Sequence, residues 1–255
     1  MIPRRSPAEI DRIDRACALV REVLVELSGA VCEGVETREL DRIAEKNAAD
    51  AGAKPAFKGY MGYPASLCIS VNEEVVHGIP GKRSLRPGDL VSIDFGVLLD
   101  GYYGDGAVTC AVPPVAEEDG KLSTVTRESL LRAIEQVRPG RRVGDIGSAV
   151  EKTATASGYS VVRDFVGHGI GTRLHEEPQV PNYGPAGPGP RIEAGMVLAI
   201  EPMVVAGDAA VKVLGDGWTA VTRDGSKAAH WELVVAATDD GPRVLGGGLT
   251  APWKE

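Results

Sequence analysis

The sequence predicts an α+β fold built from two similar halves that share one core. Two predicted helix pairs are each followed by a β-rich stretch, at roughly residues 54–113 and 160–246. Shifting the chain by 106 positions brings residues 21–52 onto 127–158, and nine of these 32 positions are identical, where chance would give about two. The alternative is that any two amphipathic helix pairs share Glu, Lys, Ala and capping Gly. A site between the halves is the natural place for function.

The composition favours a compact acidic protein that needs no disulfides. The 255 residues are 43% hydrophobic and the net charge is -8, which argues against nucleic acid or an anionic membrane as a partner. No apolar run approaches the roughly 20 residues of a membrane helix, and the start lacks the apolar core of a signal peptide. The four cysteines show no CxxC spacing, which favours a reducing compartment. We expect a cytoplasmic protein with one domain over residues 1–255 and repeats at about 8–113 and 124–246.

Four helices are predicted from apolar spacing and from their end signals. The first begins at Ser6, with Pro7 at the first helical position and Glu9 completing a capping box, and its apolar run stops at Ser28-Gly29. The second ends at Gly52, a residue suited to a helix C-terminus. The third carries Leu130, Ile134 and Val137 toward Pro139-Gly140, and the fourth carries Ile146, Ala149, Val150 and Ala154 toward Gly158.

The segment 90–105 is predicted to form a β-hairpin that carries two carboxylates. Residues 90–99 read as one strand, and Asp100-Gly101 is a strong signal for a two-residue type I′ turn. In this register Asp105 lies opposite Gly96, and Asp94 lies diagonally from Asp105 on the same face. Two carboxylates there repel each other, so a positive group should lie between them. A bulge would shift the register by one, and Asp105 would then be only a polar residue at a strand end.

A second cluster of polar residues comes from the C-terminal half. Glycines flank His168 in the run Val166–Gly171, which would let the backbone pass close to a ligand, and His175 can return to the same place across a tight turn. Glu201 and Glu232 lie in apolar, β-rich runs, where a carboxylate is rarely structural unless it is paired or bound to a metal.

These residues predict a centre for two metal ions. Four carboxylates and one imidazole carry a charge of -4 when ionised, which two divalent cations neutralise. Oxygen-rich ligation suits Mn(II), Fe(II) or Co(II), and paired metals in hydrolases activate a bridging water or hydroxide as the nucleophile. We therefore expect metal-assisted hydrolysis. The candidate ligands are Asp94, Asp105, His168, Glu201 and Glu232.

This ordered set of residues resembles the type I methionine aminopeptidases, over nearly the whole chain from the first helix to about Leu245. The resemblance implies the pita-bread fold, in which two pseudo-symmetric halves, each a helix pair with an antiparallel sheet, surround a central site. It implies that Glu201 also shuttles protons, that His175 stabilises the scissile carbonyl and that His77 contacts the substrate near the scissile bond. It also implies an apolar pocket for the methionine side chain, a role that suits aromatic and sulfur-containing residues. The matching positions are Tyr60, Tyr63, Cys68, Leu174 and Trp218.

The chain departs from the family pattern beside the candidate ligands. Leu233 and Val234 replace a common His-Thr after Glu232, and such changes near a metal typically cost 10 to 100-fold in affinity or rate. His230, in a position where relatives carry Gln or His, has no assigned role. The 25 residues between His175 and Glu201 leave no room for the type II insertion, which favours the short bacterial form. The other departures are Gly106, Ala228 and Leu174.

The resemblance implies removal of the initiator methionine from nascent polypeptides when the second residue is small. It also implies a monomer with transient ribosome association. The nearest enzymatic alternative is an Xaa-Pro aminopeptidase or dipeptidase, which usually carries an additional N-terminal domain. The alternative of another class is a peptide-binding module of the same fold that has lost its metals. Such modules lack ligands, whereas all five candidate ligands are present here.

Overall fold

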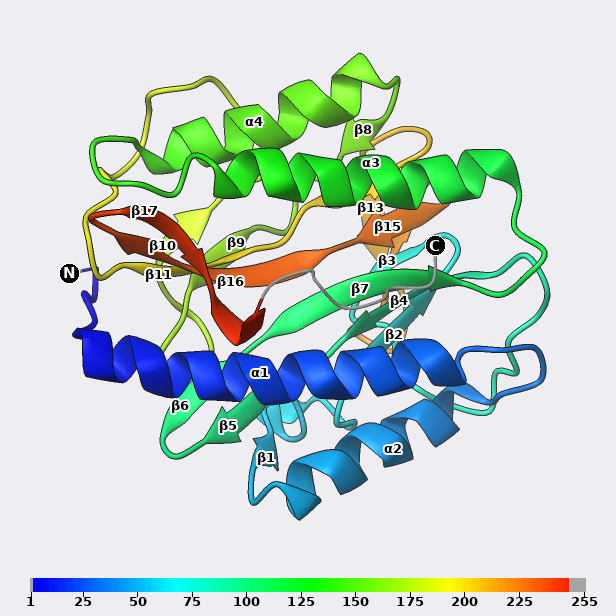
Figure 1. Ribbon diagram of the computed structural model, residues 1–255. Helices are drawn as coiled ribbons and strands as arrows, with labels where there is room; N and C mark the ends of the chain where they lie inside the picture. The colour runs from blue at the N-terminus through cyan, green and yellow to red at the C-terminus, as the bar shows by residue number, and fades with distance from the viewer. Residues whose placement is uncertain (1, 248–255) are drawn as a thin grey trace.

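The computed structural model describes residues 2–247, and Figure 1 shows two helix pairs with the strands of a large sheet between them. The first pair packs mainly against strands of the N-terminal half and the second mainly against strands of the C-terminal half. Helix α1 also reaches the second half, because Ile13 packs in one cluster with Val197 and Val234. The hydrophobic core between helices and sheet draws on all four helices, with Leu27, Leu40, Leu130 and Ile146 fully buried. The helices are α1 (Pro7–Ala30), α2 (Thr37–Asp50), α3 (Glu117–Ile134) and α4 (Val143–Ala156).

The large sheet is antiparallel and runs through both halves. Its order is β10-β9-β11-β16-β7-β4-β2, with β17 added beside β16. The halves meet where β16 pairs with β7, through Glu232 opposite Ala107 and Leu233 opposite Gly106. The strands of this sheet are β2 (Cys68–Val71), β4 (Leu90–Asp94), β7 (Gly106–Ala111), β9 (Gly167–Gly169), β10 (Glu176–Val180), β11 (Val197–Ile200), β16 (Glu232–Thr238) and β17 (Gly241–Val244).

Three small sheets and two short 3-10 turns complete the fold. Their strand orders are β1-β5-β6, β15-β12-β8 and β13-β14-β3. The strands are β1 (Lys54–Pro55), β3 (Glu74–Val76), β5 (Val97–Leu99), β6 (Tyr102–Gly104), β8 (Ser160–Val161), β12 (Met203–Val205), β13 (Val211–Val213), β14 (Ala220–Thr222) and β15 (Ala228–His230), and the turns are η1 (Tyr60–Gly62) and η2 (Leu245–Gly247).

The offset of 106 found in the sequence is also an offset in the structure. Helix α2 begins at residue 37 and ends at 50, and α4 begins at 143 and ends at 156. The strands that follow, β1 at 54–55 and β8 at 160–161, keep the same spacing. Helix composition alone does not explain this agreement, because it extends to the strands beyond the helices.

The predicted helices are present, with small differences at their ends. Ser6 caps α1 in a capping box with Glu9, as predicted, but the helix continues past Ser28-Gly29 to Ala30. Helix α3 ends at Ile134, so the prediction that Val137 belongs to the helix is wrong; Val137 is nevertheless fully buried. No helix in residues 2–247 is long and apolar enough to cross a membrane.

The predicted hairpin has the expected register but not one continuous strand. Leu99 pairs with Tyr102 across the turn, and both Asp100 and Gly101 have positive φ angles, 50° and 82°, as a type I′ turn requires. Beyond the turn Asp94 pairs with Ala107, which is the same register, so no bulge shifts it. The single strand predicted over 90–99 is wrong, because β5 leaves the partners of β4 and pairs with β1 in another sheet.

Candidate metal centre

The five candidate ligands come from five adjacent strands of the large sheet. In sheet order, His168 lies on β9, Glu201 follows β11, Glu232 begins β16, Asp105 precedes β7 and Asp94 ends β4. All five line one pocket of about 710 Å³, including the solvent at its mouth. The sheet therefore gathers residues that lie up to 138 positions apart in the chain, from 94 to 232.

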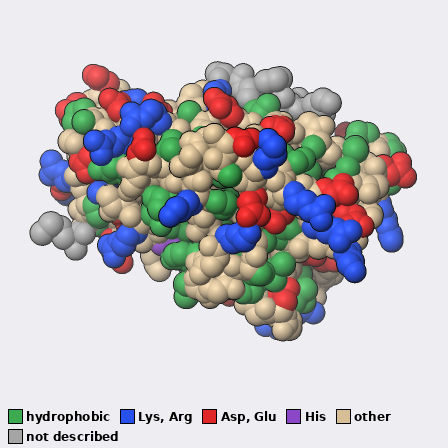
Figure 2. Space-filling model, turned by 90° about the horizontal axis from the view of Figure 1, so that it is seen from below, with side chains coloured by type: hydrophobic (Ala, Val, Ile, Leu, Met, Phe, Trp, Pro, Cys, Tyr) green, Lys and Arg blue, Asp and Glu red, His purple; other side chains and the backbone are tan. Residues whose placement is uncertain are grey.

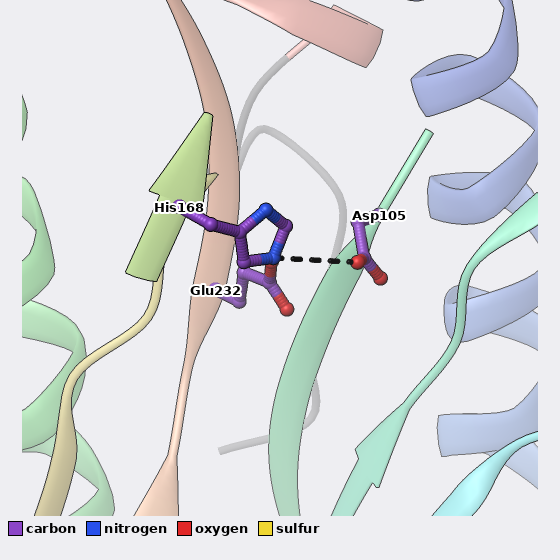
Figure 3. A group of neighbouring side chains, drawn as sticks. All are labelled: Asp105, His168 and Glu232. Carbon is purple, nitrogen blue, oxygen red and sulfur yellow. Dashed lines mark ion pairs between the residues drawn. The ribbon is translucent and has the colours of Figure 1, made fainter. Parts of the chain in front are cut away.

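Three of these residues form a compact group of possible metal ligands. Asp105, His168 and Glu232 are buried, and one ligand atom of each lies within 4.8 Å of the others. Figure 3 shows the three side chains converging from β9, β16 and the segment before β7, with His168 Nε2 4.0 Å from Asp105 Oδ2. Glu201 adjoins the group, because its Oε1 lies 3.5 Å from His168 Nε2. Asp94 lines the same pocket.

The carboxyl groups lie where an ionised carboxylate is unfavourable without a cation. Burial raises the pKa of Asp94 to about 7. Burial, followed by repulsion from neighbouring carboxylates, raises the pKa values of Asp105, Glu201 and Glu232 well above their usual range. Burial also lowers the pKa of His168 to about 3, so its imidazole is neutral and free to bind a metal.

Two orphaned oxygens show that the donor set fits metal ions. Asp94 Oδ1 and Glu232 Oε1 are buried and accept no hydrogen bond from the part of the chain that the structure describes. Buried carboxylate oxygens are normally satisfied by donors or cations. A divalent cation would satisfy them and would also reverse the repulsion within the cluster. Four carboxylates with one imidazole form an oxygen-rich set of the kind that Mn(II), Fe(II) or Co(II) prefers.

Two more histidines line the pocket, and the fourth adjoins it. The ring of His175 lies 4.3 Å from that of His168 between centroids, so the tight turn between them returns the chain to the same place, as predicted. His77 has a positive φ of 62°, and its ring packs edge-on against Phe165. His230 is buried, with Nε2 3.9 Å from Glu201 Oε2. His230 therefore lies behind Glu201.

The residues expected to form the substrate pocket lie together. The ring of Trp218 packs edge-on against Tyr63 at 5.0 Å between centroids. The Tyr60 hydroxyl lies 2.7 Å from His175 Nδ1, which ties the apolar part of the pocket to its polar end. Of the four histidines only His175 is exposed, and Figure 2 shows a small area of histidine at the surface. The residues lining the pocket include Tyr60, Tyr63, Cys68, His77, Leu174, His175 and Trp218.

Two further pocket residues are absent from the sequence prediction. Phe57 and Met61 line the pocket beside Tyr60 and Tyr63, and Met61 is 83% exposed. The available signal was their position in the same aromatic loop.

The prediction that the glycines around His168 let the backbone pass close to a ligand is wrong. They admit neighbouring backbone rather than a ligand, since a Cβ at Gly169 would lie 2.2 Å from the Glu177 carbonyl oxygen and one at Gly167 2.4 Å from that of Ala199.

The departures near Glu232 lie behind the carboxylates, toward α1. Leu233 faces Gly106 across the junction of the halves, and both line a small cavity together with Asp105 and Glu232. Val234 is fully buried in an apolar cluster that includes Ile13 of α1. Apolar packing thus surrounds the two residues that follow Glu232, where the family resemblance implied polar groups.

Comparisons with known proteins agree with this arrangement. Residues 11–239 match the model of metallopeptidase family M24. The chain is 48% identical to methionine aminopeptidase 1 of Bacillus subtilis over 245 residues, covering 96% of this chain and 99% of that protein. It superposes on methionine aminopeptidase from Thermotoga maritima with a TM-score of 0.95 at 44% identity, covering 96% and 99% of the two chains. The prolidase of Pyrococcus horikoshii shares the fold, with a TM-score of 0.78 at 24% identity over 95% and 63%.

Proposed function

The chain belongs to metallopeptidase family M24 and to its methionine aminopeptidases, with the pita-bread fold, and from this premise we propose that it removes N-terminal methionine from nascent polypeptides. The observation that carries the proposal is the single pocket that holds both the carboxylate cluster and the aromatic residues. The side chain of an N-terminal methionine would enter the aromatic end of the pocket, and the peptide bond after it would reach the carboxylate cluster. By the family resemblance we further propose a small second residue, a monomer and transient ribosome association, and from the cysteine spacing we propose a cytoplasmic location.

We assign two divalent ions to the five residues on adjacent strands. Asp94, Asp105, His168, Glu201 and Glu232 would hold them, because a single ion would leave two buried negative charges uncompensated. Ions held there supply Lewis acidity and lower the pKa of water. The candidate ions are Co, Mn, Fe(II) and similar divalent metals.

Glu201 is proposed to hold and move the proton during peptide cleavage. Its carboxyl group lines the pocket beside Asp105 and His168, where it can take up a proton and later return it. Its two oxygens face His168 and His230, at 3.5 and 3.9 Å from their Nε2 atoms. From this place Glu201 can deliver the proton to the leaving amine.

His175 is proposed to stabilise the scissile carbonyl by donating a hydrogen bond. The ring of His175 is partly desolvated where it packs against Tyr60 and His168, which lowers its pKa, so the ring is neutral near pH 7. The Tyr60 hydroxyl lies against Nδ1. If Tyr60 donates to Nδ1, the ring proton sits on Nε2 and is available to the substrate oxygen. His77, neutral because burial lowers its pKa to about 4, is proposed to contact the substrate near the same bond.

A metal-reloading assay tests the function. The protein is stripped with a chelator, reloaded with Mn(II), Fe(II) or Co(II), and offered Met-Ala-Ser and Ala-Pro peptides in parallel. We expect methionine release from the first peptide only. Cleavage of the proline peptide alone would support a prolidase-like activity instead. No cleavage with any metal would indicate a peptide-binding module.

A further inference from the structure

The turn that carries His175 is held in place by a residue from the N-terminal segment, Arg5. Nη2 of the Arg5 guanidinium donates to both carboxylate oxygens of Glu176, and the distance from Nη2 to Oε1 is 2.6 Å. Both side chains are nearly inaccessible, at 11% and 2% exposed. Glu176 directly follows His175 in the chain and begins β10. The ion pair therefore lies next to a proposed catalytic group without belonging to the substrate pocket.

Glu176 gathers the turn around its carboxylate. Oε1 accepts hydrogen bonds from the backbone N–H of Thr172 at 3.0 Å, from the Thr172 hydroxyl at 3.2 Å and from the backbone N–H of Arg173 at 3.0 Å. The Glu176 carboxylate therefore holds Thr172 and Arg173, which lie between His168 and His175, in a turn. An ionised group with so many donors is strongly oriented, and a buried one needs a positive partner.

Arg5 supplies that positive partner from a fixed position. Its backbone N–H donates to the Gly195 carbonyl at 2.7 Å, which anchors the segment before α1 to the segment before β11. The guanidinium packs closely against Gly171 of the turn, since a Cβ there would lie 2.4 Å from Arg5 Nη2 and 2.6 Å from Nε. Arg5 Nη1 also lies 3.7 Å from Glu9 Oε1 in the capping box of α1. Figure 1 shows the start of the chain at the same end of the molecule as β10 and β11.

We infer that Arg5 is a positioning residue for catalysis, which holds the Thr172–Glu176 turn so that His175 and Leu174 face the pocket. The inference rests on the proposed function, in which His175 donates to the scissile carbonyl. A ring displaced by about 1 Å would lose most of its effect on the transition state. It would affect substrate binding less, because Tyr63 and Trp218 on the aromatic side of the pocket pack against each other and not against the turn.

The experiment compares Arg5→Met with Arg4→Met, a matched control on the adjacent residue. Arg4 forms an exposed ion pair with Glu193 at 2.7 Å, and neither residue lines the pocket. Activity is measured on a methionyl peptide well below the melting temperature of each variant, with the folded fraction checked by circular dichroism. We expect Arg5→Met to lower kcat about 100-fold with KM changed less than about threefold, and Arg4→Met to match the unmodified protein. Arg5→Lys should recover part of the loss, because an ammonium restores the charge but not the two-pronged contact.

Two further measurements separate positioning from loss of stability. Amide hydrogen exchange at Thr172 and Arg173 should accelerate in Arg5→Met and stay unchanged in Arg4→Met. The double variant Arg5→Met/Glu176→Gln should be no less active than Glu176→Gln, because Arg5 acts through that carboxylate. An Arg5→Met protein with normal kcat, or additive effects in the double variant, would overturn the inference. If the unmodified protein released no methionine, the proposed function would fail, and amide exchange would still decide whether Arg5 restrains the turn.

Discussion

The two halves of the molecule share a frame and differ in their connections. In the large sheet, β2, β4 and β7 of the first half mirror β9, β11 and β16 of the second around the β7–β16 junction. Asp94 at the end of β4 corresponds to Glu201 after β11, and Asp105 before β7 corresponds to Glu232 at the start of β16. Each half thus supplies two carboxylates from equivalent places.

The third position breaks the symmetry. Cys68 begins β2 opposite Asp94, whereas β9 carries His168 opposite Ala199. Residues 56–67 join β1 to β2 in the first half, and the shorter segment 162–166 joins β8 to β9 in the second. The longer loop carries Tyr60 and Tyr63, and the second half contributes Trp218 through its own long excursion between β11 and β16. The shared frame holds the charged groups, and the unequal connections build the apolar pocket.

The largest expected effect comes from removing one equivalent carboxylate from each half. We expect Glu232→Ala and Asp105→Ala each to abolish loading of two metal ions and to lower kcat/KM by more than about 100-fold, beyond what changes around a metal site typically cost. Metal content by mass spectrometry and peptide cleavage measure this, with Glu193→Ala, at an exposed ion pair, as the control. An unchanged metal stoichiometry in either variant would show that the halves do not contribute equally.

Metal removal tests whether the centre ties the halves together. Bound ions should stabilise the folded state by about 2.7 kcal/mol at a concentration 100 times their Kd, so chelation should lower Tm by about 5–10 °C for a chain of this size. Scanning calorimetry of the stripped and reloaded protein measures the difference. Equal melting temperatures would mean that the cluster folds as well without cations.

Matched glycine substitutions probe the unequal connections. Gly101, in the hairpin of the first half, and Gly217, between β13 and β14, have positive φ angles of 82° and 79°. Alanine at either position should cost about 1–2 kcal/mol in unfolding free energy, measured with urea. Gly217→Ala should also raise KM, because Trp218 follows it, whereas Gly101→Ala should leave KM unchanged. A raised KM in Gly101→Ala together with an unchanged KM in Gly217→Ala would contradict the assignment of Trp218 to the substrate pocket.

The smallest expected effect concerns the first helix of each half. Ser6 caps α1, whereas α3 begins after Ala116 without a side-chain cap. Ser6→Ala should therefore lower stability by about 1 kcal/mol, and Ala116→Ser should raise it by about 0.5–1 kcal/mol. Urea denaturation of both variants checks the pair. A stabilised Ser6→Ala protein would show that the capping box is not needed.

Local signals predicted much of this frame correctly. The capping box at Ser6 and the turn at Asp100-Gly101 are encoded by neighbouring residues, so their geometry could be read from the sequence. The hairpin register then placed Asp94 and Asp105 together without knowledge of the rest of the chain.

Features that depend on distant contacts could not be predicted in this way. The strand predicted over 90–99 is interrupted because β4 pairs with β2 whereas β5 pairs with β1. The long loop of residues 56–67 separates β1 from β2 in the chain. The contact between Arg5 and Glu176 spans 171 positions and leaves no pattern in either segment. The roles of His77 and the aromatic loop required the family resemblance.

The junction between β7 and β16 also sets an order of events during synthesis. The donors lie on strands from both halves, and the last of them, Glu232, belongs to the strand that joins the halves. A growing chain that stops short of this strand has three of the four carboxylates and His168, but not the complete donor set. The proposed metal centre is therefore completed late, after nearly the whole polypeptide has been translated, and a copy that lacks β16 lacks the full set of donors.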